Sequence, residues 1–340
     1  MIMMNRRNLL STAAAAFAMM ATKATYAAEE DMAALAAKAA SEPVAVWYDS
    51  SRQDQADQII AAFNAKYPDA KVRQESIAGG NGMSGRLIQE AMANANSADI
   101  VSVGGGETAR LLETDIIASR DWAALGIDPK AVAEGKAVLT AVSIYCLIYN
   151  KNTTPKVPTG WDDLVDPAFK GNIGTWIRAA AFAELAATWG EEKTTDFYTR
   201  VLAQEPLFYN STAPLAQSVA AGEVALGLGI YHTALPPLEK GAPIGLVALD
   251  PTPISSIYSF ATQRAKAPNT AALFIAWLAS PDGNAVYEKI SGRGSPLLGS
   301  TNTAKFLDGR TMTEWPIKEK ARYAAIFEKY NNMVTAKAVK

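Results

Sequence analysis

Residues 141–172 read AVSIYCLIYNKNTTPKVPTGWDDLVDPAFKGN, and this stretch decides the fold. The first ten residues are almost wholly apolar, which predicts a long buried strand. The residues that follow are rich in proline, glycine and aspartate, which favour turns over regular structure. An apolar strand followed by so sharp a change of composition indicates that the chain crosses here from one domain into a second.

Upstream of this crossing, strands and helices alternate. PVAVWYDSS predicts a buried strand and a polar loop, and QADQIIAAFNAKYP predicts a helix that Pro68 ends, because its apolar residues recur at helical spacing. Three such units follow one another, at residues 43–68, 70–95 and 97–112. The alternation predicts a mainly parallel, wound sheet that binds ligands at the carboxyl ends of its strands.

Downstream of the crossing, the sequence predicts a second α/β region with no internal repeat. A chain of 340 residues with 49% hydrophobic residues is long and apolar enough for two domains. The expected helices lie at 182–190 and 196–203, a helix and strand at 213–231, a strand at 255–262, and two helices at 266–290.

The first stretch, MIMMNRRNLLSTAAAAFAMMATKATYAAEE, predicts an export signal. Arg6 and Arg7 precede an alanine-rich apolar run that is too short to span a membrane, and small residues suit a cleavage site before Ala28. NRRNLLS is similar to the core of a twin-arginine signal, with a general secretory signal as the alternative. We therefore expect residues 1–27 to be removed on export.

Composition excludes several kinds of partner. Removing residues 1–27 takes away Arg6, Arg7 and Lys23 and no acid, so the formal net charge changes from −2 to −5. No basic run interleaves with aromatic residues, so we expect no nucleic-acid partner. The single cysteine, Cys146, cannot form an internal disulfide, and its apolar neighbours predict an inert buried thiol. We expect a monomer without a cofactor.

Several motifs, in order along the chain, carry a resemblance to one family. The most specific is LIYNKNTTPKVPTGWDDLVDPAFKGNIG, with its Tyr-Asn strand end, Trp-Asp-Asp-Leu turn and Pro-x-x-Lys-Gly turn. The others are VWYDSS with AAFNAKYPDAKV, SADIVSVGGGE, AGEVALGLG, and KAPNTAALFIAWLASPDGNAV. With them the chain resembles the periplasmic solute-binding proteins of ABC importers, of the ferric-iron, thiamine, polyamine and phosphorylated-sugar type.

The resemblance implies an α/β, two-lobed periplasmic-binding-protein fold of class II type. Two hinge strands would join the lobes, near residues 141–146 and 254–260. The lobes would comprise residues 42–143 with 258–300, and residues 144–257 with 301–340. The implied function is capture of a small solute between the lobes in the periplasm and its delivery to an ABC permease in the inner membrane, without a chemical reaction.

The loop GGNGMSG contains the spacing G-x-G-x-x-G at Gly80, Gly82 and Gly85, which is typical of dinucleotide binding. That fingerprint needs an acidic residue at the end of the next strand, whereas Asp99 stands at the beginning of ADIVSV. A turn that directs backbone N–H groups at an anion explains the same glycines, and so does a tight turn without a ligand.

His232 is the only histidine of the chain and directly follows Tyr231. As a catalytic base it would need a nucleophile, and the chain has no G-x-S-x-G elbow, so we do not expect an enzyme. Relatives bind ferric iron through two adjacent tyrosines at this position, and this chain has histidine in place of the second. Iron held by Tyr231, His232, Tyr145 and Glu107 stays the alternative, because hard Fe³⁺ prefers oxygen ligands.

The favoured ligand is a small organic or anionic solute. Arg178 could grip a phosphate, phosphonate or carboxylate through two hydrogen bonds, Trp176 could cover an apolar portion, and Glu107 could accept from an amine. Tyr231 and His232 would line the cleft as a wall. The full set of expected contacts is Ser50, Ser51, Asn81, Gly82, Gly105, Gly106, Glu107, Tyr145, Trp176, Arg178, Asn210, Ser211, Thr212, Tyr231 and His232.

Overall fold

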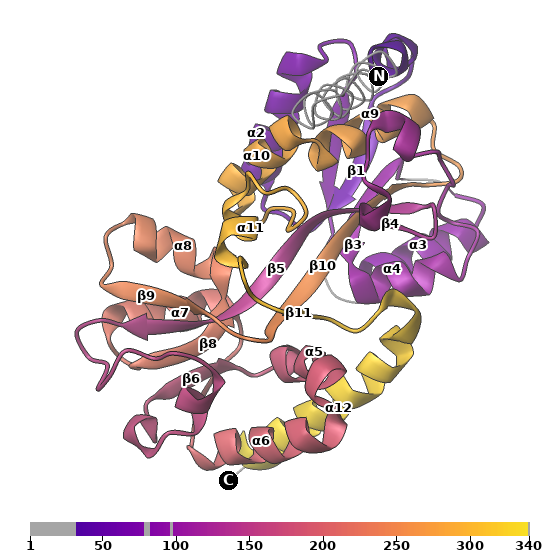
Figure 1. Cartoon of the computed structure of the whole chain (residues 1–340). Helices are drawn as coiled ribbons and strands as arrows, with labels where there is room; N and C mark the ends of the chain where they lie inside the picture. The colour runs from indigo at the N-terminus through magenta and orange to yellow at the C-terminus, as the bar shows by residue number, and fades with distance from the viewer. Residues whose placement is uncertain (1–31, 78–81, 96–97, 339–340) are drawn as a thin grey trace, which may run out of the picture.

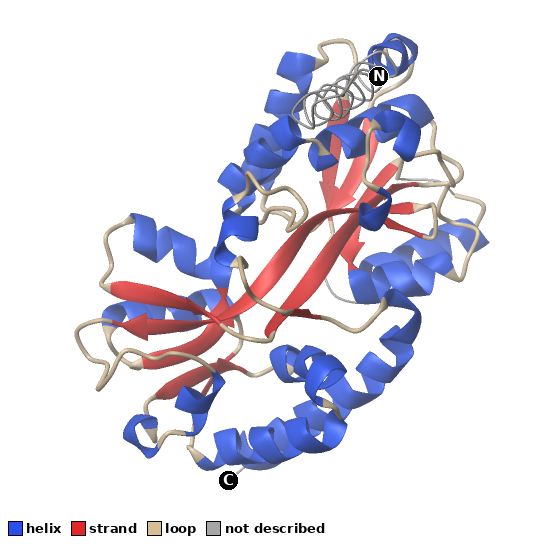
Figure 2. Ribbon diagram, viewed as in Figure 1, coloured by secondary structure: helices blue, strands red, loops and turns tan. Residues whose placement is uncertain are grey.

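The computed structural model describes residues 32–77, 82–95 and 98–338. At its centre lies an eleven-stranded sheet with the main path β2-β1-β3-β10-β5-β8-β6-β7. Helices cover the sheet at both of its ends, and two long strands run between these ends (Figure 1; Figure 2). The molecule is therefore an α/β protein with two lobes.

The boundaries of the elements follow the sequence pattern closely. The strands are β1 (Ala45–Asp49), β2 (Val72–Ser76), β3 (Ile100–Gly104), β4 (Val132–Ala133), β5 (Ala137–Asn150), β6 (Ile173–Trp176), β7 (Leu207–Tyr209), β8 (Leu226–Ile230), β9 (Ile244–Ala248), β10 (Thr252–Ala261) and β11 (Met312–Thr313). The helices are α2 (Gln53–Lys66), α3 (Gly82–Met92), α4 (Gly105–Leu112), α5 (Ala180–Trp189), α6 (Glu191–Ala203), α7 (Thr212–Ala221), α8 (Tyr231–Glu239), α9 (Pro268–Ala279), α10 (Pro281–Ser291), α11 (Asn302–Phe306) and α12 (Lys320–Ala338).

The two crossing strands are β5 and β10, as the sequence predicts. β5 pairs antiparallel with β10 over residues 138–144 and with β8 and β9 over residues 145–150. Its partners therefore change between Ile144 and Tyr145, inside the expected hinge. Both strands are largely buried because they lie between other strands, which explains the long apolar run that marked the crossing.

Each lobe has its own apolar core. We call the part built on β1, β2, β3, α2, α3, α4, α9 and α10 the first lobe, and the part built on β6 to β9, α5 to α8 and α12 the second lobe. Trp47, Phe63, Phe274 and Trp277 pack together in the first core. Trp161, Phe182, Phe197, Tyr198 and Tyr330 pack together in the second.

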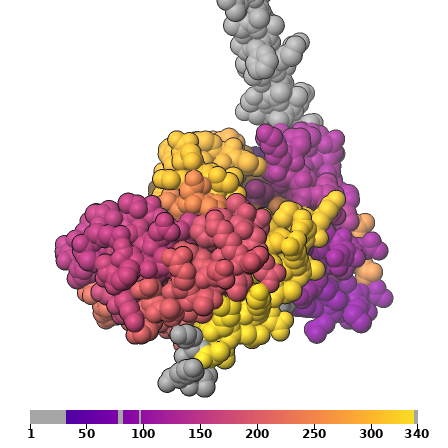
Figure 3. Space-filling view, turned by 60° about the horizontal axis from the view of Figure 1, so that its bottom comes forward, coloured from indigo at the N-terminus to yellow at the C-terminus, as the bar shows by residue number. Residues whose placement is uncertain are grey.

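The C-terminal segment makes a third connection between the lobes. After α11 the chain pairs β11 in parallel with β10 and continues into α12, which packs against α5 and α6 of the second lobe. Trp315 fixes this path, because its indole N–H donates to the carbonyl of Ala183 at 2.7 Å. Figure 3 shows this segment in yellow, lying between the two lobes.

The structure differs from the sequence prediction at three strand exits and in the sheet. The strands β1, β2 and β3 of the first units are parallel as predicted, but the whole sheet is mixed, because β5 runs antiparallel to β8, β9 and β10, and β10 runs antiparallel to β3. Gly82 and Gly85 lie in α3 rather than in a loop, and Gly105 and Gly106 lie in the first turn of α4. Tyr231 begins α8 rather than ending a strand. At these three strand exits the helix begins within the residues that the sequence predicted as loop or strand.

The export signal over residues 1–27, Gly80 of the glycine-rich loop and the solute contact Asn81 lie outside the described residues. Within the part of the chain that the structure describes, no helix combines the length and hydropathy needed to cross a membrane. Cys146 lies in β5 with no exposed surface, and burial raises the pKa of its thiol, as expected for an inert cysteine.

Candidate functional site

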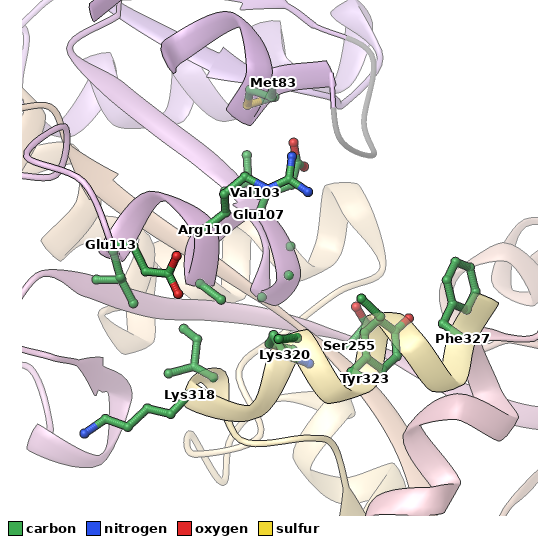
Figure 4. Close-up of a pocket in the computed structure, with 18 of the residues that line it drawn as sticks. Met83, Val103, Glu107, Arg110, Glu113, Ser255, Lys318, Lys320, Tyr323 and Phe327 are labelled. Carbon is green, nitrogen blue, oxygen red and sulfur yellow. The ribbon is translucent and has the colours of Figure 1, made fainter. Parts of the chain in front are cut away.

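Two cavities open where the carboxyl ends of the strands of both lobes meet. The first, which we call the α12 cavity, encloses about 700 Å³ between α4 of the first lobe and α12 of the second (Figure 4). The other, the α8 cavity, encloses about 830 Å³ between α10 of the first lobe and α8 of the second. Ser50, at the exit of β1, lines both cavities, so they are adjoining parts of one cleft.

The first-lobe wall of the α12 cavity is the N-terminal turn of α4. Gly105, Gly106 and Glu107 all line the cavity. The Glu107 carboxylate is buried, and its Oε1 accepts from the backbone N–H of Ser84 at 3.0 Å, near the start of α3. Burial raises the pKa of Glu107, while the Ser84 hydrogen bond lowers it. Glu107 therefore holds two helix ends together as well as facing the cavity.

The second-lobe wall of the α12 cavity contains Arg178, just after β6. Its guanidinium carbon lies 5.2 Å from the ring centroid of Trp176 and 5.2 Å from that of Phe327. The Trp176 indole is itself fixed, since its N–H donates to the carbonyl of Asn210 at 3.1 Å. Two aromatic rings thus hold an exposed guanidinium in place at the edge of the cavity, which reduces the entropy that it loses on binding an anion.

A buried ion cluster closes the base of the α12 cavity. Lys320 Nζ lies 3.2 Å from Glu184 Oε1 and 3.1 Å from Glu314 Oε1. Glu314 also accepts from the backbone N–H of Ser256, on the crossing strand β10, at 3.0 Å. A Cβ at Gly105 would lie 3.3 Å from both Glu314 Oε1 and Lys320 Cε. The cluster therefore touches both lobes and a hinge strand.

This cluster predicts a dependence of stability on pH. Burial raises the pKa of Glu184 to about 8, with Glu314 adding to the rise and Lys320 opposing it. Between pH 4.5 and 8 the native protein holds a proton that the unfolded chain has lost, so this group makes stability fall as pH rises through that window. Urea unfolding at pH 5, 6.5 and 8 should show a smaller loss for Glu184→Gln, which is neutral throughout. If the wild type and Glu184→Gln lost the same stability between pH 5 and pH 8, Glu184 would not be the source of the pH dependence.

The α8 cavity is lined by Ser50 and Ser51 from the first lobe and by Tyr231 and His232 from the second. The Tyr231 ring packs on that of Phe306, with centroids 4.5 Å apart. Burial raises the pKa of its phenol. Tyr231 is thus a packing wall of the cleft.

His232 is bound to the first lobe. Its Nε2 lies 2.9 Å from a terminal nitrogen of Arg293, which lies between α10 and α11. Beside it, the buried Asp49 accepts from the N–H of Ser51 at 2.7 Å, and burial raises the pKa of Asp49.

The structure brings the expected solute contacts together only in part. The α12 cavity collects Ser50, Gly105, Gly106, Glu107 and Arg178, and the α8 cavity collects Ser50, Ser51, Tyr231 and His232. Trp176 and Asn210 lie behind Arg178 as its support. Tyr145, Ser211, Thr212 and Gly82 line neither cavity. Their roles as solute contacts remain predictions.

The four residues considered for iron do not all line one cavity, and their role as iron ligands stays a prediction. Glu107 lines the α12 cavity, whereas Tyr231 and His232 line the α8 cavity, and Tyr145 lines neither. Burial raises the pKa of the Tyr145 phenol, which opposes the phenolate that Fe³⁺ requires. Among the described residues, no three His, Cys, Asp or Glu side chains are grouped so that they could hold a metal ion.

Several cavity residues were missed by the sequence prediction. Lys320, Tyr323 and Phe327 lie at spacings of three and four, which places them on one face of α12, and this helical period was a usable signal. Glu184 sits in an alanine-rich helix that reads as uniformly buried. Arg293 stands alone in SGRGSP, and no local pattern connects it with His232.

Comparison with solved structures supports the two-lobed fold. Iron-bound HitA from Pseudomonas aeruginosa aligns with a TM-score of 0.71 and 19% identity, over 85% of this chain and 99% of that one. AfuA from Actinobacillus pleuropneumoniae, with exogenous fructose-6-phosphate bound, aligns with a TM-score of 0.68 and 20% identity, over 86% and 98%. The substrate-binding protein of an ABC transporter from Agrobacterium tumefaciens aligns with a TM-score of 0.72 and 18% identity, over 86% and 95%.

Sequence comparison identifies the family. An uncharacterized protein of Haemophilus influenzae is 27% identical over 155 residues, and the match spans 44% of this chain and 44% of that relative. The family model of the bacterial extracellular solute-binding proteins matches residues 58–314, which is most of the chain. With this match and the two-lobed fold, the chain belongs to the bacterial extracellular solute-binding proteins.

Proposed function

We propose that this protein captures a small organic solute with an anionic group between its two lobes and delivers it unchanged to the permease of an ABC importer. The proposal that the solute is anionic is based on Arg178, whose guanidinium is held between Trp176 and Phe327 at the edge of the α12 cavity. The N-terminal turn of α4 faces it from the first lobe, and such a turn favours negative charge.

The mechanism we propose is lobe closure around the solute. A solute that touches α4 and Arg178 binds both lobes at once, so it binds the closed form more tightly than the open form and shifts the equilibrium toward closure. The strands β5 and β10 are the hinges, and the lobes comprise residues 42–143 with 258–300 and residues 144–257 with 301–340. The protein works as a periplasmic monomer without catalysis, after export by the twin-arginine or the general secretory route.

Iron is less favoured, although HitA and other structural neighbours are iron-binding proteins. In this chain Arg293 donates to His232, and its positive charge opposes a metal cation at the same place. The α12 cavity also contains both acids and bases, which suits an organic solute with more than one polar group.

A thermal-shift screen followed by small-angle scattering tests the proposal. Phosphates, phosphonates, carboxylates, amino acids, polyamines, thiamine and ferric citrate are screened, and we expect an anionic organic solute to raise the melting temperature. At a hundredfold excess over its dissociation constant a ligand adds about 2.7 kcal/mol of stability. The same solute should reduce the radius of gyration and be recovered intact. Conversion of the solute to a product, or an unchanged scattering curve with every stabilising compound, would contradict capture by closure.

A further inference from the structure

His232 and Arg293 join the lobes on the side of the cleft away from the ion cluster. His232 lies in the first turn of α8, and Arg293 follows α10. Besides the hydrogen bond of 2.9 Å between them, the chain approaches closely at Gly292, where a Cβ would lie 2.9 Å from that of His232. Gly292 has φ +71°, so glycine suits both the space and the backbone.

The hydrogen bond fixes the tautomer of the imidazole. A guanidinium can only donate, so Nε2 of His232 must accept from Arg293. A neutral imidazole that accepts at Nε2 carries its proton on Nδ1. Burial, together with the positive charge of Arg293, lowers the pKa of His232 well below 6.5, which agrees with a neutral ring. His232 therefore presents an Nδ1–H donor.

Two N–H donors are consequently left without an acceptor. The Nδ1 atom of His232 and the Nε atom of Arg293 are both buried, and neither has a hydrogen-bond partner. A buried donor without an acceptor destabilises the native state, so each requires a structural reason. One donor comes from each lobe, and both belong to residues that line the α8 cavity.

The neighbouring acids do not fill this need. Asp49 accepts from the N–H of Ser51, and Glu288 accepts from the N–H groups of Asn302 and Thr303, each at 2.7 Å, but neither carboxylate is hydrogen-bonded to Arg293 or His232. Arg293 is attracted by the charge of Asp49 and is hydrogen-bonded to the Tyr287 hydroxyl, and neither contact gives His232 Nδ1 an acceptor. The two donors lack an oxygen atom that accepts hydrogen bonds without donating any. Carboxylate, phosphate, phosphonate and sulfate groups supply such oxygens.

We infer that Arg293 and His232 form an oxyanion-binding point in the α8 cavity, where an anionic oxygen accepts from Arg293 on the first lobe and from His232 Nδ1–H on the second. The inference rests on the proposed function, because an oxyanion that bridges donors of the two lobes favours the closed form. The cleft would then have two anion contacts, Arg178 in the α12 cavity and the Arg293–His232 pair in the α8 cavity, with Ser50 lining both cavities.

The single histidine makes the test direct. In protein freed of any purification tag, the imidazole ¹⁵N signals report only His232. We expect the free protein to show the Nδ1–H tautomer, and inorganic phosphate or sulfate to shift the Nδ1 signal saturably, while chloride at the same ionic strength does not. An Nε2–H tautomer, or signals unmoved by both oxyanions, would overturn the inference.

Three variants separate binding from folding. His232→Gln keeps an acceptor for Arg293 near the position of Nε2 but removes the Nδ1 donor, whereas His232→Asn keeps a donor near the position of Nδ1. Arg293→Lys keeps the charge and removes the Nε donor. Calorimetry with phosphate should show about tenfold weaker binding for His232→Gln and Arg293→Lys than for His232→Asn, with melting curves confirming that all three fold. Equal affinity in all three variants and the wild type would refute the oxyanion point.

The outcomes also separate this inference from the proposed function. If an organic solute closes the lobes while the His232 signals stay unchanged and phosphate does not bind, the oxyanion point is wrong and solute capture stands. If phosphate shifts the His232 signals but no organic solute closes the lobes, the oxyanion point stands and the proposed capture fails.

Discussion

Lys320→Met is expected to lower the free energy of unfolding by about 3–5 kcal/mol, the cost of leaving a buried charge without its partner. Lys320 is 8% exposed and neutralises Glu184, which is 3% exposed. Without the ammonium group, the buried carboxylate must either stay charged in an apolar surrounding or take up a proton. Urea unfolding at pH 9, followed by circular dichroism, measures the loss, because Glu184 with its raised pKa of about 8 is ionised there.

The matched control is Lys318→Met, in the same segment but exposed, which should change stability by no more than about 0.5 kcal/mol. The double variant Lys320→Met, Glu184→Gln should be more stable than Lys320→Met alone, because the unpaired charge is gone. If Lys320→Met unfolds at the wild-type urea concentration, or if the double variant gains nothing, the ion cluster does not hold the C-terminal segment in place.

Arg178→Ala is expected to weaken binding of the anionic solute found in the screen by about a hundredfold. The substitution removes a charge-assisted contact that is positioned in advance by two aromatic rings, and such contacts contribute about 1.5–3 kcal/mol. Arg178→Lys should lose less, because the charge remains while the planar, two-pronged donor is lost. Calorimetric titration of each variant with the same solute gives the dissociation constants.

Arg322→Ala is the control for general loss of positive charge. Arg322 is also exposed and also stacks on a ring, with its guanidinium carbon 4.9 Å from the centroid of Trp315, but it lines neither cavity. We expect its affinity to stay within about twofold of the wild type. If the Arg178→Ala variant binds the solute as tightly as the Arg322→Ala variant does, Arg178 does not contact the solute.

The helices and strands were predicted well from the sequence because buried segments are recognisable from the spacing or the continuity of their apolar residues. β5 is flanked by strands on both sides, so nearly every residue is apolar and the crossing can be recognised without neighbours. The two helices divided at Pro281 were likewise predicted, since proline at the start of α10 and the Ser280 cap act locally. Features that depend on a few adjacent residues could be predicted from the chain alone.

The site was predicted less completely because its key contacts join distant residues. Glu184 and Lys320 are 136 positions apart, and His232 and Arg293 are 61 apart. Nothing near any of these four residues shows that its partner exists, since the pairing depends on how the two lobes and the C-terminal segment meet. Arg178 was identified because it stands just before a helix, where relatives place a ligand-contacting loop, so the resemblance supplied what the local pattern could not.

The burial of Cys146 gives the protein a practical use. Its thiol is the only one in the chain and is hidden within β5, so alkylating dyes should not react with the native protein. A cysteine introduced at the rim of the cleft could then be labelled alone with an environment-sensitive fluorophore. Such a conjugate would convert lobe closure into an optical signal, and the protein would serve as a reagentless sensor for its own solute.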